Sequence, residues 1–374
     1  MPTDPVEIEE HDRIVETVLS CRDLDAMVDF LRERLGCRID TIVPADDPSE
    51  VVLSGCGARF RAVRGDDVSS HLRLVRTDRP ADDPPERWVA PNGTIVDVVG
   101  GSAVVVTPSA VPEVVVVRSS DGDAFGEGRA GMGYRDLLPG RWGGRYIASH
   151  IRIDDGGDVA DYVHYHRIRF QMIFVAAGWV DVVYEDQGEP FRMHAGDCVL
   201  QPPEIRHRVL RSSPGLEVIE FGSPARHDTL VEHVIELPTT TVDARRDFGG
   251  QTFVRHVATA SRSAPADDLP DGFVACDVGI GAATSGLADV RVVSVVEVVG
   301  HDHGPVSVRD GFEIVTDVVL SGCARLRIVD GDAETTVDVG PRDAVSFPAG
   351  ATWSWEAPSS DFEYLDITVC AADR

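Results

Sequence analysis

The stretch GDVADYVHYHRIRFQMIFVAAG, residues 157–178, decides the fold of this chain together with GDCVLQPPEIRH, residues 196–207. His164 and His166 are two positions apart in the first stretch. Successive side chains of a β-strand point to opposite faces, so both imidazoles project from the same face of a strand. This spacing suits two imidazoles that share one metal ion.

Gln171 and His207 lie in segments that predict further strands of the same barrel. Apolar residues recur there at every second position, as on the inward face of a strand: Ile173, Val175, Ile205 and Val209. Gly178 and Gly196 fall where hairpins must turn. The sequence therefore predicts a β-barrel in which three histidines and one glutamine meet.

These residues resemble the two sequence motifs of the cupin superfamily. Carried over residue by residue, the resemblance implies that His164, His166 and His207 are metal ligands and that Gln171 is a further, weaker ligand. Most metal-binding cupins have glutamate where this chain has Gln171, and Glu204 stands where glycine is expected. A histidine pair alone is also typical of a surface or a core; the second motif in register favours a metal site.

A second copy of the layout follows in the chain. The residues after Asp136 resemble those after Asp277 in layout, and each copy leads into a histidine pair, His301 and His303 in the second. Trp353 stands where the third histidine should be, and tryptophan cannot bind a metal. We therefore expect a bicupin, in which the second barrel is degenerate and packs against the first. Its site is expected to be empty; the alternative is that His301, His303 and an inward-turned Glu313 hold an ion.

The first segment predicts a different domain. Residues 16–20 predict a strand, and Asp23 precedes a helical repeat of apolar residues that ends before Gly36. Three further strands are predicted, at residues 39–43, 51–53 and 58–63. This β-α-β-β-β order resembles one module of the vicinal oxygen chelate superfamily, to which glyoxalase and bleomycin-resistance proteins belong. Residues 91–97 resemble the closing hairpin of a second, truncated module without a helix.

Glu16 and Asp97 take the positions at which the vicinal oxygen chelate resemblance implies metal ligands. Two carboxylates without a histidine suit a hard cation only, and a structural or oligomerising role is the alternative we favour. The predicted fold class is mainly β: two cupin barrels after a small α+β domain. The predicted boundaries are 1–106 for the α+β domain, 107–134 for a linker with edge strands, 135–240 for the metal-binding barrel and 241–374 for the degenerate barrel.

Composition restricts the partners. The chain has 374 residues and a formal net charge of −28, which disfavours nucleic acid and anionic membrane surfaces because both attract a basic face. All 35 basic residues are arginine, so a lysine Schiff base is excluded. No apolar run approaches the roughly 20 residues of a membrane span. The acidic start lacks a secretory signal and the seven cysteines are scattered, so we expect a cytoplasmic protein, and a homodimer.

The predicted site favours a small anionic substrate. Three neutral imidazoles and a neutral Gln171 leave a divalent metal its full charge, which suits a catecholate, an enolate or an α-hydroxy acid. Fe(II) is the expected metal, with Mn, Ni, Cu and Zn as alternatives. The cupin resemblance implies a dioxygenase of the quercetin or gentisate type; a cupin isomerase or lyase and a non-catalytic binder are the alternatives. Tyr162 shares the parity of His164 and is a candidate catalytic residue, or else a packing residue. No nucleotide cofactor is predicted.

Overall fold

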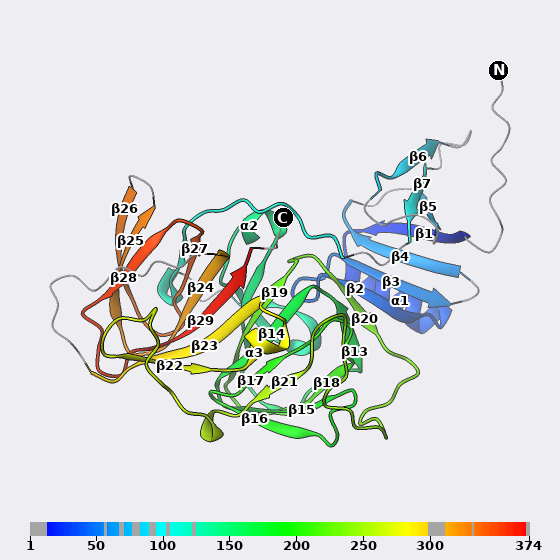
Figure 1. The fold of residues 1–374 in the computed structure, drawn as a ribbon. Coiled ribbons are helices and arrows are strands. Elements are labelled where there is room, and N and C mark those ends of the chain that lie inside the picture. Colours follow the sequence, from blue (N-terminus) through cyan, green and yellow to red (C-terminus); the bar gives the residue numbers. More distant parts are fainter. Residues whose placement is uncertain are drawn as a thin grey trace. The chain divides into compact units, whose positions relative to one another are not determined.

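The structure of the chain is a computed structural model, and two compact units are recognised in it (Figure 1). The structure describes residues 13–55, 58–66, 71–76, 83–89, 95–101, 105–121, 125–297, 311–330 and 333–371. Unit 1 comprises Met1–Val106, His164–Arg167 and Arg226–Val234. Unit 2 comprises Thr107–Val163, Ile168–Ala225 and Ile235–Arg374. Among the described residues, no helix has the length and apolar character needed to cross a membrane.

Unit 1 is a mixed sheet with one helix, α1 (Leu24–Leu35). The carboxylate of Asp23 caps the helix by accepting a hydrogen bond from the backbone N–H of Ala26 (2.9 Å), and Gly36 ends it with a left-handed φ of 64°. Its strands are β1 (Arg13–Cys21), β2 (Arg38–Val43), β3 (Glu50–Gly55), β4 (Ala58–Arg64), β5 (His71–Arg76), β6 (Glu86–Val89), β7 (Ile95–Gly100), β13 (His164–Arg167) and β20 (Asp228–Val231). The predicted β-α-β-β-β order is confirmed.

The sheet of unit 1 is extended by strands from far along the chain. Its order is β13-β20-β2-β3-β4-β1-β5-β7-β6, in which Thr41 of β2 lies opposite Leu230 of β20. The helix covers one face, where Leu24 and Leu31 pack with Leu53 of β3. No helix lies between β4 and β7 in the residues that the structure describes there. The resemblance of this unit to the vicinal oxygen chelate superfamily stays a prediction.

The first barrel of unit 2 has two sets of antiparallel strands. One sheet has the order β21-β17-β14-β19-β11-β10-β9, and β12, β15, β16 and β18 form the other wall. The bounds are β9 (Gly126–Glu127), β10 (Gly133–Asp136), β11 (Ile147–Ile153), β12 (Gly157–Asp158), β14 (Phe170–Ala177), β15 (Trp179–Tyr184), β16 (Phe191–His194), β17 (Cys198–Leu200), β18 (His207–Ser212), β19 (Leu216–Ser223) and β21 (Val254–His256). Val175, Val182 and Val218 lie in the apolar interior.

The second barrel repeats this arrangement. One sheet has the order β22-β23-β29-β24-β27-β8 and the other β26-β25-β28. The bounds are β8 (Val115–Val117), β22 (Phe273–Asp277), β23 (Ala288–Val295), β24 (Phe312–Ser321), β25 (Ala324–Asp330), β26 (Ala333–Val339), β27 (Ala344–Pro348), β28 (Thr352–Glu356) and β29 (Glu363–Cys370). The predicted fold class, mainly β with two cupin-type barrels after a small α+β domain, is confirmed.

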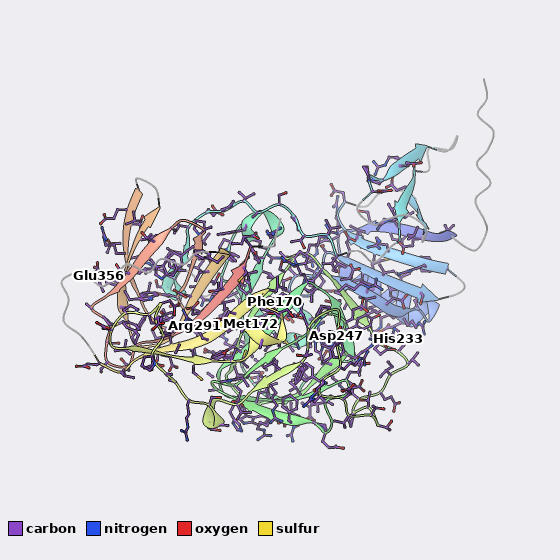
Figure 2. All side chains as sticks on the ribbon, in the orientation of Figure 1. Phe170, Met172, His233, Asp247, Arg291 and Glu356 are labelled. Atoms are coloured by element: carbon purple, nitrogen blue, oxygen red, sulfur yellow. The ribbon has the colours of Figure 1, made fainter. Side chains whose placement is uncertain are left out.

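The two barrels share one apolar core. Phe170 and Met172 of β14, both labelled in Figure 2, belong to the same buried cluster as Ile314 of β24 and Leu365 of β29. Trp142 is also fully buried in this cluster. Side chains of one sheet point alternately to its two faces. One face lines the interior of its own barrel, and the other face packs against the neighbouring barrel. The second barrel thus covers a sheet face that would otherwise be exposed.

The internal repeat predicted from the sequence is confirmed at a short turn in each barrel. The carboxylate of Asp136 accepts a hydrogen bond from the N–H of Leu138 (2.8 Å), and that of Asp277 accepts one from Gly279 (2.6 Å). A short helix follows in both copies, α2 (Arg141–Gly144) and α3 (Ile280–Ala283). Each helix leads into a long strand, β11 or β23, so the two copies have the same local chain path.

The turn at α2 is strained. All residues from 140 to 144 have positive φ, including Arg141 (50°) and Trp142 (47°). This region costs a residue with a side chain roughly 1–2 kcal/mol. The indole of Trp142 is fully buried, and this burial offsets the strain. At Gly143 an added Cβ would lie 2.7 Å from Cγ2 of Val111, so glycine is required there.

A polar network also links the barrels. Arg342, from the second barrel, donates through Nε to Glu217 of β19 (2.5 Å), and Nε2 of His150 lies 3.4 Å from the same carboxylate. Arg135 donates to Nδ1 of His150 (3.2 Å); since arginine only donates, the imidazole proton is on Nε2. The close approach of His150, together with Arg342, lowers the pKa of Glu217 to about 2.

Replacing Glu217 with glutamine is expected to reduce the free energy of unfolding at pH 7 by about 1 kcal/mol, after allowance for solvent screening. Because the folded-state pKa of Glu217 is depressed, its contribution is present above the unfolded value and is lost as the pH falls toward 2. Denaturant titrations from pH 7 to pH 2 measure this, with the exposed Glu189→Gln as control. A stability difference that does not shrink with falling pH would contradict the assignment.

Candidate metal centre

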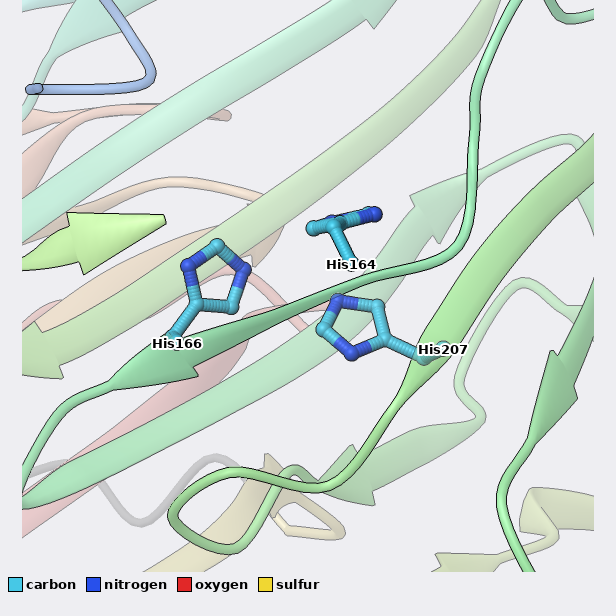
Figure 3. A group of neighbouring side chains, drawn as sticks. All are labelled: His164, His166 and His207. Atoms are coloured by element: carbon cyan, nitrogen blue, oxygen red, sulfur yellow. The ribbon is translucent and has the colours of Figure 1, made fainter. Parts of the chain in front are cut away.

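Three of the predicted site residues come together. His164 and His166 lie on β13, and His207 is the first residue of β18. All three are buried, and one ring nitrogen from each lies within 4.8 Å of those of the other two. Figure 3 shows the three rings turned toward a common space. This is the only such group of histidine, cysteine and carboxylate side chains within the described residues.

Hydrogen bonds orient two of the rings. Nδ1 of His207 lies 3.0 Å from the carbonyl oxygen of Ile205; a carbonyl only accepts, so Nδ1 carries the proton and Nε2 is the unprotonated nitrogen. Nδ1 of His166 lies 3.0 Å from the hydroxyl of the fully buried Thr229. Metal-binding histidines typically use the second nitrogen in this way, because it fixes the ring.

The electrostatics of the site favour neutral imidazole. Burial lowers the pKa of His207 to about 4, since a charged ring loses its hydration inside the barrel. At neutral pH the ring is therefore in the form that binds a metal. Three buried imidazoles whose ring nitrogens lie within 4.8 Å of one another suit a divalent transition metal.

Gln171 lies on β14 and is buried. Its Nε2 donates to Oε1 of Glu220 (2.5 Å). Its own Oε1 is buried and has no hydrogen-bond partner among the described residues. An orphaned amide oxygen fits a cation, because a metal ion would supply the missing positive partner. The role of Gln171 as a fourth ligand stays a prediction.

Glu220 is a residue that sequence reasoning missed. It lies on β19 in the segment LEVIEFGS, which has two glutamates. Of these only Glu220 shares the parity of the inward-facing Val218. A charged residue at an inward position of a buried strand is a usable signal of function. Its contact with Gln171, however, could not be read from local spacing, because the pairing of β19 with β14 joins residues far apart in sequence.

Tyr162 precedes β13 and is half-buried. The guanidinium carbon of Arg129 lies 5.6 Å from the centre of its ring. Arg129 forms an ion pair with the buried Asp161, whose other oxygen accepts a hydrogen bond from the N–H of Val209 (2.9 Å), two residues after His207. Asp161 thus holds the strand of His207 in place. The catalytic role of Tyr162 stays a prediction.

The degenerate site of the second barrel can be described only in part. His301 and His303 lie outside the described residues. Trp353 is buried and stacks on Phe347, with ring centres 4.4 Å apart, so it is a core residue of the second barrel. Glu313, a possible acidic ligand there, accepts a hydrogen bond from Nη2 of Arg145 in the first barrel (2.7 Å).

The carboxylates of unit 1 are paired with arginines. Buried Glu16 lies 3.1 Å from Nε of Arg59 and 3.3 Å from Nε of Arg61. Asp97 accepts two hydrogen bonds from Arg87, of 2.6 and 2.9 Å. Both carboxylates that the vicinal oxygen chelate resemblance implied as metal ligands thus form ion pairs with guanidinium groups. This arrangement favours a structural role.

Comparison with known proteins adds likenesses of fold. No family model and no curated protein matches the sequence. Among solved structures, the protein YlbA from E. coli is similar over 72% of this chain and 95% of its own, with 11% identity and a TM-score of 0.49. Oxalate decarboxylase from Bacillus subtilis is similar over 71% of this chain and 78% of its own, with 12% identity and a TM-score of 0.49. The cupin resemblance rests on the motifs and strand order of this chain.

Proposed function

We propose that this chain is a metal-dependent enzyme, a dioxygenase that acts on a small anionic oxygenated molecule such as a catecholate, an enolate or an α-hydroxy acid. The observation that carries the proposal is the group of three buried histidines whose ring nitrogens lie within 4.8 Å of one another. His164, His166 and His207 would hold the metal, and the orphaned Oε1 of Gln171 would complete the set.

The ligand set supports an anionic substrate. Neutral imidazoles and a neutral amide do not reduce the charge of a divalent ion, so an anion is the favoured further ligand. When bound, Fe(II) would supply the redox chemistry by which an anionic substrate reacts with O₂. The protein holds the proton of His207 on Nδ1, so that Nε2 is the nitrogen that would bind the metal.

Metal analysis and oxygen uptake test the proposal. Protein purified without added metal is expected to contain Fe, and the Fe-loaded protein is expected to consume O₂ with at least one member of a panel of catechols, diketones and α-hydroxy acids. Turnover without oxygen uptake would instead indicate an isomerase or lyase that uses the metal as a Lewis acid. Ligand binding without turnover would indicate a binding protein. Either outcome contradicts the dioxygenase assignment, and Zn as the resident metal would argue against it.

A further inference from the structure

We infer that Glu220 is a positioning residue that fixes the amide of Gln171, so that its oxygen and not its nitrogen is presented to the metal. The inference rests on the proposed metal centre. A glutamate at position 171 would bring its charge directly to the metal. Here Gln171 is neutral, and the charge is carried by Glu220, which accepts a hydrogen bond from it.

The strand pairing places both side chains inside the first barrel. In the antiparallel pair of β14 and β19, Gln171 lies opposite Gly222 and Ile173 lies opposite Glu220. Gln171 shares its parity with Ile173, and Glu220 shares its parity with Val218, and both of these apolar residues belong to the barrel interior. The two polar side chains are therefore diagonal neighbours on one inner face.

The chemistry of the contact determines the orientation of the amide. A carboxylate only accepts hydrogen bonds, so the NH₂ group of Gln171 must face Glu220, at the observed 2.5 Å. The amide oxygen then points away from Glu220. It is buried and accepts no hydrogen bond from the described residues. Leaving such an acceptor unsatisfied costs its desolvation, and a bound cation would offset this cost.

The same contact makes the oxygen a better ligand. A hydrogen bond donated to a carboxylate draws positive charge to the NH₂ end of the amide and leaves more negative charge on its oxygen. Acidic partners of a ligand act in this way at other metal sites, where they set both its orientation and its donor strength. Glu220 thus offsets the weakness of a neutral amide as a ligand.

Two variants of the full-length protein test the inference. Glu220→Gln removes the charge and leaves the amide of Gln171 free to turn, so we expect the affinity for Zn²⁺ or Co²⁺ to fall about 10–100-fold. The double exchange Gln171→Glu with Glu220→Gln retains one carboxylate and one amide in the same space, and is expected to restore most of the affinity. Glu189→Gln, at an exposed turn, is the control and should bind like the wild type.

The measurements are chelator competition with Zn²⁺, the visible spectrum of the Co²⁺ form and the thermal midpoint with and without metal. A positioning role predicts a nearly unchanged midpoint for the metal-free variant and a smaller metal-induced rise. Unchanged affinity in Glu220→Gln overturns the inference, as does a double exchange no better than the single variant. If Glu220→Gln does not fold, the double exchange is compared with the wild type, and a loss of metal affinity of about 10-fold or more overturns the inference. A wild type that binds neither ion overturns the proposed metal centre itself.

Discussion

Replacing His207 with alanine is expected to lower the affinity for a divalent metal by at least about 100-fold. Loss of a residue that only hydrogen-bonds to a metal ligand typically lowers the affinity by less than this. The variant removes one of the three ring nitrogens that lie within 4.8 Å of one another. His164→Ala is expected to have the same effect. Elemental analysis of protein purified without added metal, followed by chelator competition, measures the loss.

Two other histidines are the matched controls. His194→Ala changes an exposed histidine of the same barrel and should retain the metal. His301→Ala changes the histidine pair of the second barrel, where Trp353 replaces a ligand, and should retain it as well. Equal loss of metal in His207→Ala and His301→Ala would contradict the assignment of the site to His164, His166 and His207.

Replacing Trp142 with alanine is expected to reduce the free energy of unfolding by about 3–5 kcal/mol. The indole is fully buried in the core that both barrels share, and its burial compensates for the left-handed backbone at this position. Such a loss is a large part of the roughly 5–15 kcal/mol that stabilises a typical protein. Denaturant unfolding, followed by fluorescence and circular dichroism, measures it.

Trp179→Ala is the control for this variant, because Trp179 is only half-buried. Its ring has the guanidinium of Arg192 at 3.5 Å, a contact worth about 0.5–1 kcal/mol at such a site.

Because one core serves both barrels, we expect them to unfold in a single transition. Two separate transitions, or equal effects of Trp142→Ala and Trp179→Ala, would contradict a shared core.

The sequence predicted those features that depend on local spacing. The two-residue separation of His164 and His166 determines that they share a face, whatever the strand later pairs with. Likewise Asp23 and Gly36 mark the ends of α1 through their own backbone and side-chain chemistry. The repeat also emerged from the order of residues after Asp136 and Asp277.

Features that depend on long-range register could not be predicted. Glu220 meets Gln171 only because β19 pairs with β14 in one register, and a shift by one residue would turn Glu220 away from the interior. The approach of Arg129 to Asp161 depends on a loop conformation that the sequence pattern does not encode. Cytoplasmic location, the homodimer, the vicinal oxygen chelate relationship and the choice of metal stay predictions.

The discontinuous sheet of unit 1 also affects how the chain folds during synthesis. Thr41 of β2 lies opposite Leu230 of β20, so the edge of β2 stays open on the ribosome until β20 has left the exit tunnel. By then most strands of the first barrel have already emerged, since folding generally proceeds from the N-terminus as the chain lengthens. The first domain to be translated is thus completed only after Val234 has been synthesised, when most of the first barrel has already emerged.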